Sequence, residues 1–158
     1  MVIDAHLVVG PVPQGVPDLA VAPFAMPPRE QCRPARSEIV SLLDHLRVDN
    51  DPATDPLVPG EGVVRSWVDL REPEAPDHLF AVLVGDALIP TVHRLGHPGW
   101  APTVQLTALL HTVPAPGALA AQSTIGEIRD GWFDEETAVV DATGRLVSRV
   151  RQLARLPR

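Results

Sequence analysis

Lysine is absent from this sequence: all 13 basic residues are arginine. A Schiff-base enzyme needs a lysine amine and a phosphate-binding P-loop needs its own lysine, so both mechanisms are excluded. The formal net charge of −7, with 20 acidic residues against 13 basic ones, argues against general nucleic-acid binding. We therefore expect no nucleic-acid partner.

Cysteine and long apolar runs are also scarce. A single cysteine, Cys32, cannot form an internal disulfide, which fits a reducing cytoplasm. No positively charged region followed by an apolar stretch opens the chain, so we expect no secretory signal. The most apolar run, residues 79–92, is interrupted by Asp86 and Pro90, which argues against a membrane span. These absences predict a cytoplasmic protein without a membrane partner.

The 158 residues suffice for one domain with a sizeable core, and 45% of them are hydrophobic. Residues 1–36 contain seven of the 18 prolines, so 10–36 is predicted to be a linker or surface strap. Ahead of it, 3–9 alternate like a short strand, which looks like the last strand of a unit whose beginning is absent. The domain itself is expected over 37–158.

Periodicity predicts one helix and six strands in this domain. The helix is expected over 77–90, with Asp77 as its cap and Pro90 at its end. It is apolar nearly all round, so it should be buried on most sides, and Gly85 inside it suggests close backbone packing. Turn residues separate the strands, which are expected at 43–50, 61–70, 103–113, 119–128, 132–141 and 145–156.

Gln152 lies on the apolar side of the last strand. Side chains alternate across a strand, which groups Gln152 with Ser148 and Val150 and leaves Val147 and Arg151 on the wet face. Unpaired amide positions in an apolar setting cost a few kcal/mol, so the side chain must be hydrogen-bonded. A structural tie to a backbone group is one reading, and a functional role is the other.

The order of elements is strand, strand, long helix and four strands. A helix lying across an antiparallel sheet covers the apolar surface of both. The predicted class is therefore α+β, with an antiparallel sheet wrapped around one long central helix. This is the order of elements in the hotdog fold.

Three segments resemble the second half of the acyl-CoA thioesterase II family. They are Val-Gly-Asp-Ala-Leu-Ile-Pro at 84–90, Trp-Ala-Pro-Thr-Val-Gln-Leu at 100–106, and Asp-Ala-Thr-Gly-Arg-Leu-Val-Ser-Arg-Val-Arg-Gln-Leu-Ala at 141–154. Members of that family normally carry two hotdog units, with an aspartate, a threonine and a glutamine in the site. The resemblance implies that these residues are Asp86, Thr103 and Gln152.

The resemblance also implies chemistry and partners. An acyl-CoA thioester would be hydrolysed by a water that Asp86 deprotonates, without a metal, a cofactor or a covalent intermediate. Burial would raise the pKa of Asp86, donors from Gln152 and Thr103 would oppose that rise, and both would orient the water. The absence of a Gly-x-Ser-x-Gly elbow agrees. Because the first unit is missing, a homodimer or higher oligomer is expected.

The same residues also support other interpretations. The second hypothesis is a non-catalytic acyl-binding module, or the partner of a separately encoded first half. A dehydratase is a third hypothesis, although His78 lies outside any histidine–carboxylate arrangement of that kind. Asp86 can be read as a capped buried carboxylate, and Thr103 as a plain strand residue that shares a face with Gln105 and Thr107.

Several further residues are weaker candidates. His93 and His97 have the spacing of a helical metal site, but Gly96 and Pro98 disfavour a helix there. Cys32 has no evident histidine partner, so a nucleophilic role is not expected. The remaining polar clusters are read as solvated surface rather than as a catalytic group or a coenzyme A phosphate site: Asp134, Glu135 and Glu136, and Arg149, Arg151 and Arg155.

Overall fold

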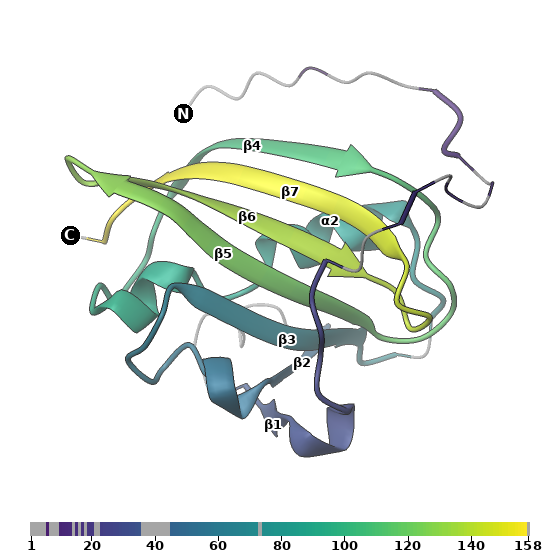
Figure 1. Cartoon of the computed structure of the whole chain (residues 1–158), viewed down its shortest axis with the longest axis horizontal. Coiled ribbons are helices and arrows are strands. Elements are labelled where there is room, and N and C mark those ends of the chain that lie inside the picture. Colours follow the sequence, from purple (N-terminus) through teal and green to yellow (C-terminus); the bar gives the residue numbers. More distant parts are fainter. Residues whose placement is uncertain are drawn as a thin grey trace.

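A seven-stranded antiparallel sheet wraps around one α-helix in the computed structural model, which describes residues 6, 10–13, 15, 17, 19–20, 23–35, 45–72 and 74–157 (Figure 1). The strand order is β1-β2-β3-β5-β6-β7-β4, and every neighbouring pair is antiparallel. The elements are η1 (Arg29–Gln31), β1 (Arg33–Pro34), β2 (Leu46–Asn50), η2 (Pro52–Thr54), β3 (Val63–Leu70), α2 (His78–Asp86), η3 (Thr91–Leu95), β4 (Thr103–Leu110), β5 (Leu119–Arg129), β6 (Trp132–Val140) and β7 (Leu146–Arg155).

The central helix begins where the sequence predicts and ends earlier. The Asp77 side chain accepts a hydrogen bond from the backbone N–H of Phe80 at 2.7 Å, which confirms the predicted cap. The helix ends at Asp86 instead of Pro90. Proline lacks an N–H for the carbonyl of Asp86 and disfavours helical backbone at Ile89, so the last turn cannot form. Asp86 consequently lies at the helix end, beside the following loop.

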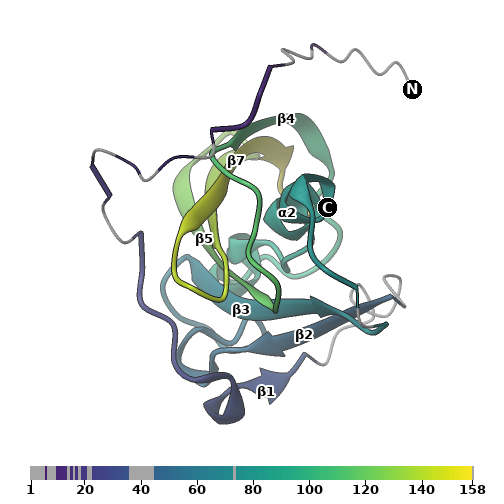
Figure 2. The ribbon, with the colours of Figure 1, turned by 90° about the vertical axis from the view of Figure 1, so that its right-hand side faces the viewer.

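One side of α2 faces the sheet and another does not. Figure 2 shows the sheet bending around the helix, with β4 and β7 above it and β3 and β2 below. Phe80 and Val84 are buried against this sheet, whereas Leu79 is 68% exposed and Leu83 is 42% exposed. The prediction of burial on most sides is therefore wrong for the flank that carries these two leucines.

One stretch of the described residues has the length and composition of a membrane span. His78–Leu95 is long and apolar enough to cross a membrane by length and composition, contrary to the sequence-based expectation. However, 56% of this stretch is buried within the domain, and buried core helices share this length and composition. This property is therefore weak evidence for insertion in a membrane.

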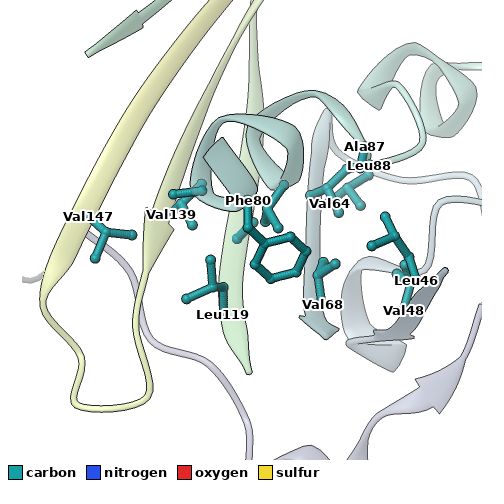
Figure 3. Packing of buried hydrophobic residues seen from close by; sticks show 13 residues of the cluster. Leu46, Val48, Val64, Val68, Phe80, Ala87, Leu88, Leu119, Val139 and Val147 are labelled. Atoms are coloured by element: carbon teal, nitrogen blue, oxygen red, sulfur yellow. The ribbon is translucent and has the colours of Figure 1, made fainter. Parts of the chain in front are cut away.

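The core lies between α2 and the inner face of the sheet. Figure 3 shows the Phe80 ring among Val64, Val68 and Leu119. Gly85 packs directly on β7, where an added Cβ would stand 2.3 Å from Val150 Cγ2. The close packing predicted at this glycine is confirmed, and it fixes how near the helix end comes to the last strand.

A tight turn and a bulge set the register of β7. Asp141 accepts hydrogen bonds from the backbone N–H groups of Thr143 and Arg145 and from the Arg145 guanidinium. Burial by itself would raise the pKa of Asp141, but its hydrogen bonds outweigh burial and lower this pKa to about 2. Beyond the turn, Ser148 pairs with Val139 while Leu146 pairs with Val140. Val147 is therefore an extra residue, and it is fully buried instead of facing water as predicted.

Part of the proline-rich segment packs across the outer side of β2 and β3. The Trp67 indole N–H donates to the carbonyl of Pro27 at 3.0 Å, and the Arg29 guanidinium binds both Asp49 and Asp69. We call residues 23–35 the strap. The strand predicted at 3–9 lies outside the described residues except for His6, and the division into 1–36 and 37–158 stays a prediction.

Candidate active site

The three predicted site residues line one cavity. Its volume is about 220 Å³, and it lies between the end of α2, the start of β4 and the inner face of β7. Asp86, Thr103 and Gln152 face it together with apolar walls that include Trp100 and Phe133. Polar groups converging in an apolar hollow are typical of a small-molecule site.

Gln152 is buried, as its strand position predicts, with 7% of its surface exposed. Its Oε1 accepts a hydrogen bond from the Thr103 hydroxyl at 2.7 Å, and its Nε2 donates to a carboxylate oxygen of Glu135. Both partners are side chains, whereas the structural reading of this residue expected a backbone group. Gln152 therefore connects two neighbouring strands through their polar side chains.

Thr103 reaches Gln152 because β4 begins with a bulge. Thr103 pairs with Ala154 and Gln105 pairs with Leu153, so Val104 is the extra residue. The bulge moves Gln105 to the opposite face, and the expectation that Gln105 and Thr107 share a face with Thr103 is wrong. Of these three polar side chains, Thr103 alone turns toward the cavity at the helix end.

Asp86 has a perturbed carboxylate. Loss of hydrating water among the neighbouring groups raises the pKa of Asp86, as expected, although the residue is exposed at the mouth of the cavity. Among the described residues no hydrogen bond to this carboxylate is found, and burial is the only cause of its raised pKa. The Thr103 hydroxyl donates to Gln152, and the Gln152 amide donates to Glu135. The prediction that these two donors oppose the rise is therefore wrong, and the carboxylate is free to accept from a bound molecule.

Glu135 is the polar residue of the site that the sequence-based reading placed wrongly. The sequence predicts a solvated position for it, yet it is 2% exposed and lies on the inner face of β6. Its Oε2 accepts from the Thr91 hydroxyl at 2.7 Å and from the Thr91 backbone N–H at 3.1 Å. Alternation with Phe133 and Thr137, which are both buried, was the signal that could have placed it inside.

The other polar candidates belong to the opposite face of the sheet. A hollow of about 690 Å³ lies there, where Arg149 pairs with Glu136 and Arg151 pairs with Asp134. Arg155 stacks over the Trp132 ring at 4.4 Å. Since each of the first two arginines already has an acidic partner, this face matches the prediction of a solvated surface better than a phosphate site.

The histidine and cysteine candidates also have local partners. His93 Nε2 lies 2.8 Å from the carbonyl oxygen of Gly99, within the loop that leads to β4. The Cys32 thiol is 3.9 Å from the carbonyl oxygen of Pro28. Over the residues that the structure describes, no group of three or more His, Cys, Asp or Glu side chains is arranged to hold a metal ion.

An antiparallel sheet wrapped around a central helix defines a hotdog-fold protein, and this one has an apolar-walled cavity at the helix end. A hotdog-fold structure from Alicyclobacillus acidocaldarius superimposes with a TM-score of 0.79 at 16% identity, over 92% of this chain and 58% of that one. Residues 16–156 match the acyl-CoA thioesterase C-terminal domain family. The chain belongs to this family, and thioester hydrolysis is the general role that this membership supports.

Closer relatives extend beyond the length of this chain. A Thermobifida fusca protein classed as a candidate thioesterase II is 39% identical, with a TM-score of 0.81 over 92% of this chain and 58% of that one. Uncharacterized proteins of Mycobacterium tuberculosis and Mycobacterium bovis are 47% identical over 95 residues, which are 60% of this chain and 32% of theirs. The chain thus spans about a third of the curated relatives that it matches.

Proposed function

We propose that this chain hydrolyses acyl-CoA-type thioesters to a free acid and a thiol, through a water positioned by Asp86, Thr103 and Gln152. The convergence of these three side chains on one apolar-walled cavity carries the proposal. Family membership and the likeness to the Thermobifida fusca protein support it at the level of thioester chemistry.

The hydrogen-bond directions suggest how the water is held. Thr103 donates its hydroxyl hydrogen to Gln152, so the hydroxyl oxygen can only accept a hydrogen bond from a water. A water that donates to Thr103 and to the Asp86 carboxylate keeps a lone pair for the carbonyl carbon. As the water oxygen attacks, Asp86 takes a proton; when the tetrahedral intermediate collapses, the carbon–sulfur bond breaks and this proton returns to the departing thiolate.

Thiol release from acyl-CoAs of short, medium and long chains tests the proposal. The Cys32→Ser variant should serve as the enzyme, because Cys32 is the one thiol in the sequence and would react with the detecting reagent. We expect release that is proportional to enzyme and faster than buffer hydrolysis for at least one chain length. A folded protein that is inactive against every chain length, alone and with a supplied first hotdog unit, would rule the proposal out.

A partner that completes the cavity is proposed as well, most simply a second copy in a homodimer or higher oligomer. Apolar side chains of α2, β4 and the loop between them are exposed beside the cavity, and we call them the α2–β4 face: Leu79 (68%), Leu83 (42%), Trp100 (68%), Val104 (57%) and Leu106 (36%). Several exposed apolar side chains on neighbouring elements beside a site favour a protein contact. The alternative function, a module that is inactive without a separate first half, rests on the same surface.

Leu83→Glu tests this interface. Burying a carboxylate among apolar side chains is costly, so we expect a wild-type dimer to become a monomer and to lose most activity. Light scattering coupled to size-exclusion chromatography measures the change, and Leu57→Glu is the matched control, because Leu57 is 53% exposed in the loop before β3. An active wild-type monomer would contradict the proposed oligomer. An inactive wild type that becomes active with a supplied first unit would support the alternative.

A further inference from the structure

The carboxylate of Glu135 is enclosed between two elements of the site. Glu135 lies opposite Gln152 of β7 in the sheet, and its Oε1 accepts a hydrogen bond from the Gln152 amide. Its Oε2 accepts hydrogen bonds from Thr91 at the start of η3. Only 2% of the residue is exposed. Placing a charge there is costly unless donors surround it, and three donors do so: the Gln152 amide and the backbone N–H and hydroxyl of Thr91.

The charge on Glu135 determines which end of the Gln152 amide faces it. An ionised carboxylate only accepts hydrogen bonds, so the amide must present its nitrogen to Glu135 and its oxygen to Thr103. The Thr103 hydroxyl can then only donate to that oxygen, which it does at 2.7 Å. The direction of every hydrogen bond from the cavity to η3 thus follows from one buried charge.

We propose that Glu135 is a positioning residue, whose negative charge fixes the amide orientation of Gln152 and thereby keeps the Thr103 oxygen as an acceptor toward the cavity. This inference rests on the proposed function, because the acceptor matters when a water must be aimed at a thioester. Glu135 acts through Gln152 and Thr103, and it is not itself among the residues that line the cavity.

Protonation of Glu135 would reverse the chain of hydrogen bonds. A neutral carboxyl group can donate to the Gln152 oxygen, so the amide can turn over, and the Thr103 hydrogen is then released into the cavity. Burial raises the pKa of Glu135, although its hydrogen bonds from Thr91 and Gln152 favour the charged form. The charge of Asp86 also raises the pKa of Glu135. The other residues that face Glu135 are uncharged: Thr91 from η3, Gln152 from β7 and Ile125 from β5.

Glu135→Gln removes the charge and nearly keeps the shape. The backbone N–H of Thr91 still requires an oxygen, so the new amide oxygen stays with Thr91 and its nitrogen faces Gln152. This arrangement forces the Gln152 amide to turn over. We expect kcat for thioester hydrolysis to fall by up to about 100-fold with little change in KM, and the acid limb of the pH profile to lose the contribution of one proton.

Glu136→Gln is the matched control, because Glu136 is the next residue on β6, is exposed and pairs with Arg149 on the opposite face. We expect less than a twofold change in kcat for this variant. If Glu135→Gln hydrolyses thioesters like the wild type with an unchanged pH profile, the positioning role is overturned while the proposed function stands.

A spectroscopic measurement tests the same inference without any activity. The sequence has five glutamines, so nitrogen-15 labelling of glutamine gives a small set of side-chain amide signals, and Gln152→Glu identifies the one that belongs to Gln152. In the wild type the side-chain amide signals of Gln152 should titrate together with the carboxyl carbon of Glu135. In Glu135→Gln the titration of the Gln152 signals should vanish. Gln152 signals that ignore both the pH change and the substitution would overturn the proposal, even in a protein with no thioesterase activity.

Discussion

Replacing Asp86 with asparagine should lower kcat/KM for thioester hydrolysis by about 10²- to 10⁴-fold, the range typical of a lost general base. Asparagine preserves the shape of the side chain at the end of α2, but it cannot accept a proton from water. Thiol release measured with saturating and limiting acyl-CoA separates this loss from a change in binding. Asp77→Asn is the control, since asparagine caps the start of the same helix as well as aspartate does.

The pH dependence of wild-type activity shows which protonation state of Asp86 is active. A general base works in its deprotonated form, so activity should rise with pH through the pKa of Asp86, which lies above the usual value for an aspartate. Below that pKa the carboxylate is protonated and activity is lost. Residual activity of Asp86→Asn should lack this dependence on Asp86. A variant that retains wild-type kcat/KM would remove Asp86 from the mechanism.

Gly85→Ala should destabilise the domain by about 1 to 3 kcal/mol, the cost of overfilling a packed core. Alanine normally favours a helix over glycine by about 1 kcal/mol, so the expected sign is opposite to the helix propensity. The reason is that the new Cβ would lie 2.3 Å from Val150 Cγ2 and 2.8 Å from Val150 Cβ. Urea unfolding measures the change as a shift of the midpoint at constant slope.

Two further variants test whether the Gly85 effect comes from this contact. Val150→Ala removes the methyl groups that the new Cβ would meet, so the double variant should lose less stability than the sum of the two single variants. Gly15→Ala should be nearly neutral, because among the described residues no atom beyond its chain neighbours lies within 4 Å of a Cβ at that position. A Gly85→Ala protein that is as stable as the wild type would show that α2 has room to move away from β7.

The fold and the position of Gln152 could be predicted because they follow from strong local patterns. Alternation in the last strand places Gln152 inside, and Asp77 marks the start of the helix. The position of Asp86 came from the motif around it, and the structure brings it to the same cavity as Thr103 and Gln152. Their catalytic roles stay predictions.

The bulges could not be read from the sequence. One extra residue reverses the facing of every residue after it, and Val104 and Val147 look like ordinary strand residues. Glu135 was missed for a different reason: between two other acidic residues it resembles a solvated run, and only its pairing with Gln152 shows why a carboxylate is tolerated inside. Exposure of Leu83 depends on which segments pack against α2. The sequence of the helix itself does not specify those segments.

The strap also matters for protein engineering. Because Arg29 binds both Asp49 and Asp69 while the carbonyl of Pro27 accepts from the Trp67 indole, the strap is anchored to β2 and β3. A hotdog unit fused upstream of Pro23 through a short flexible tether would stay near the domain at a millimolar effective concentration. Such a fusion would favour a contact that is too weak to form between separate molecules, and cutting the tether with a protease would reveal how much of the assembly depends on it.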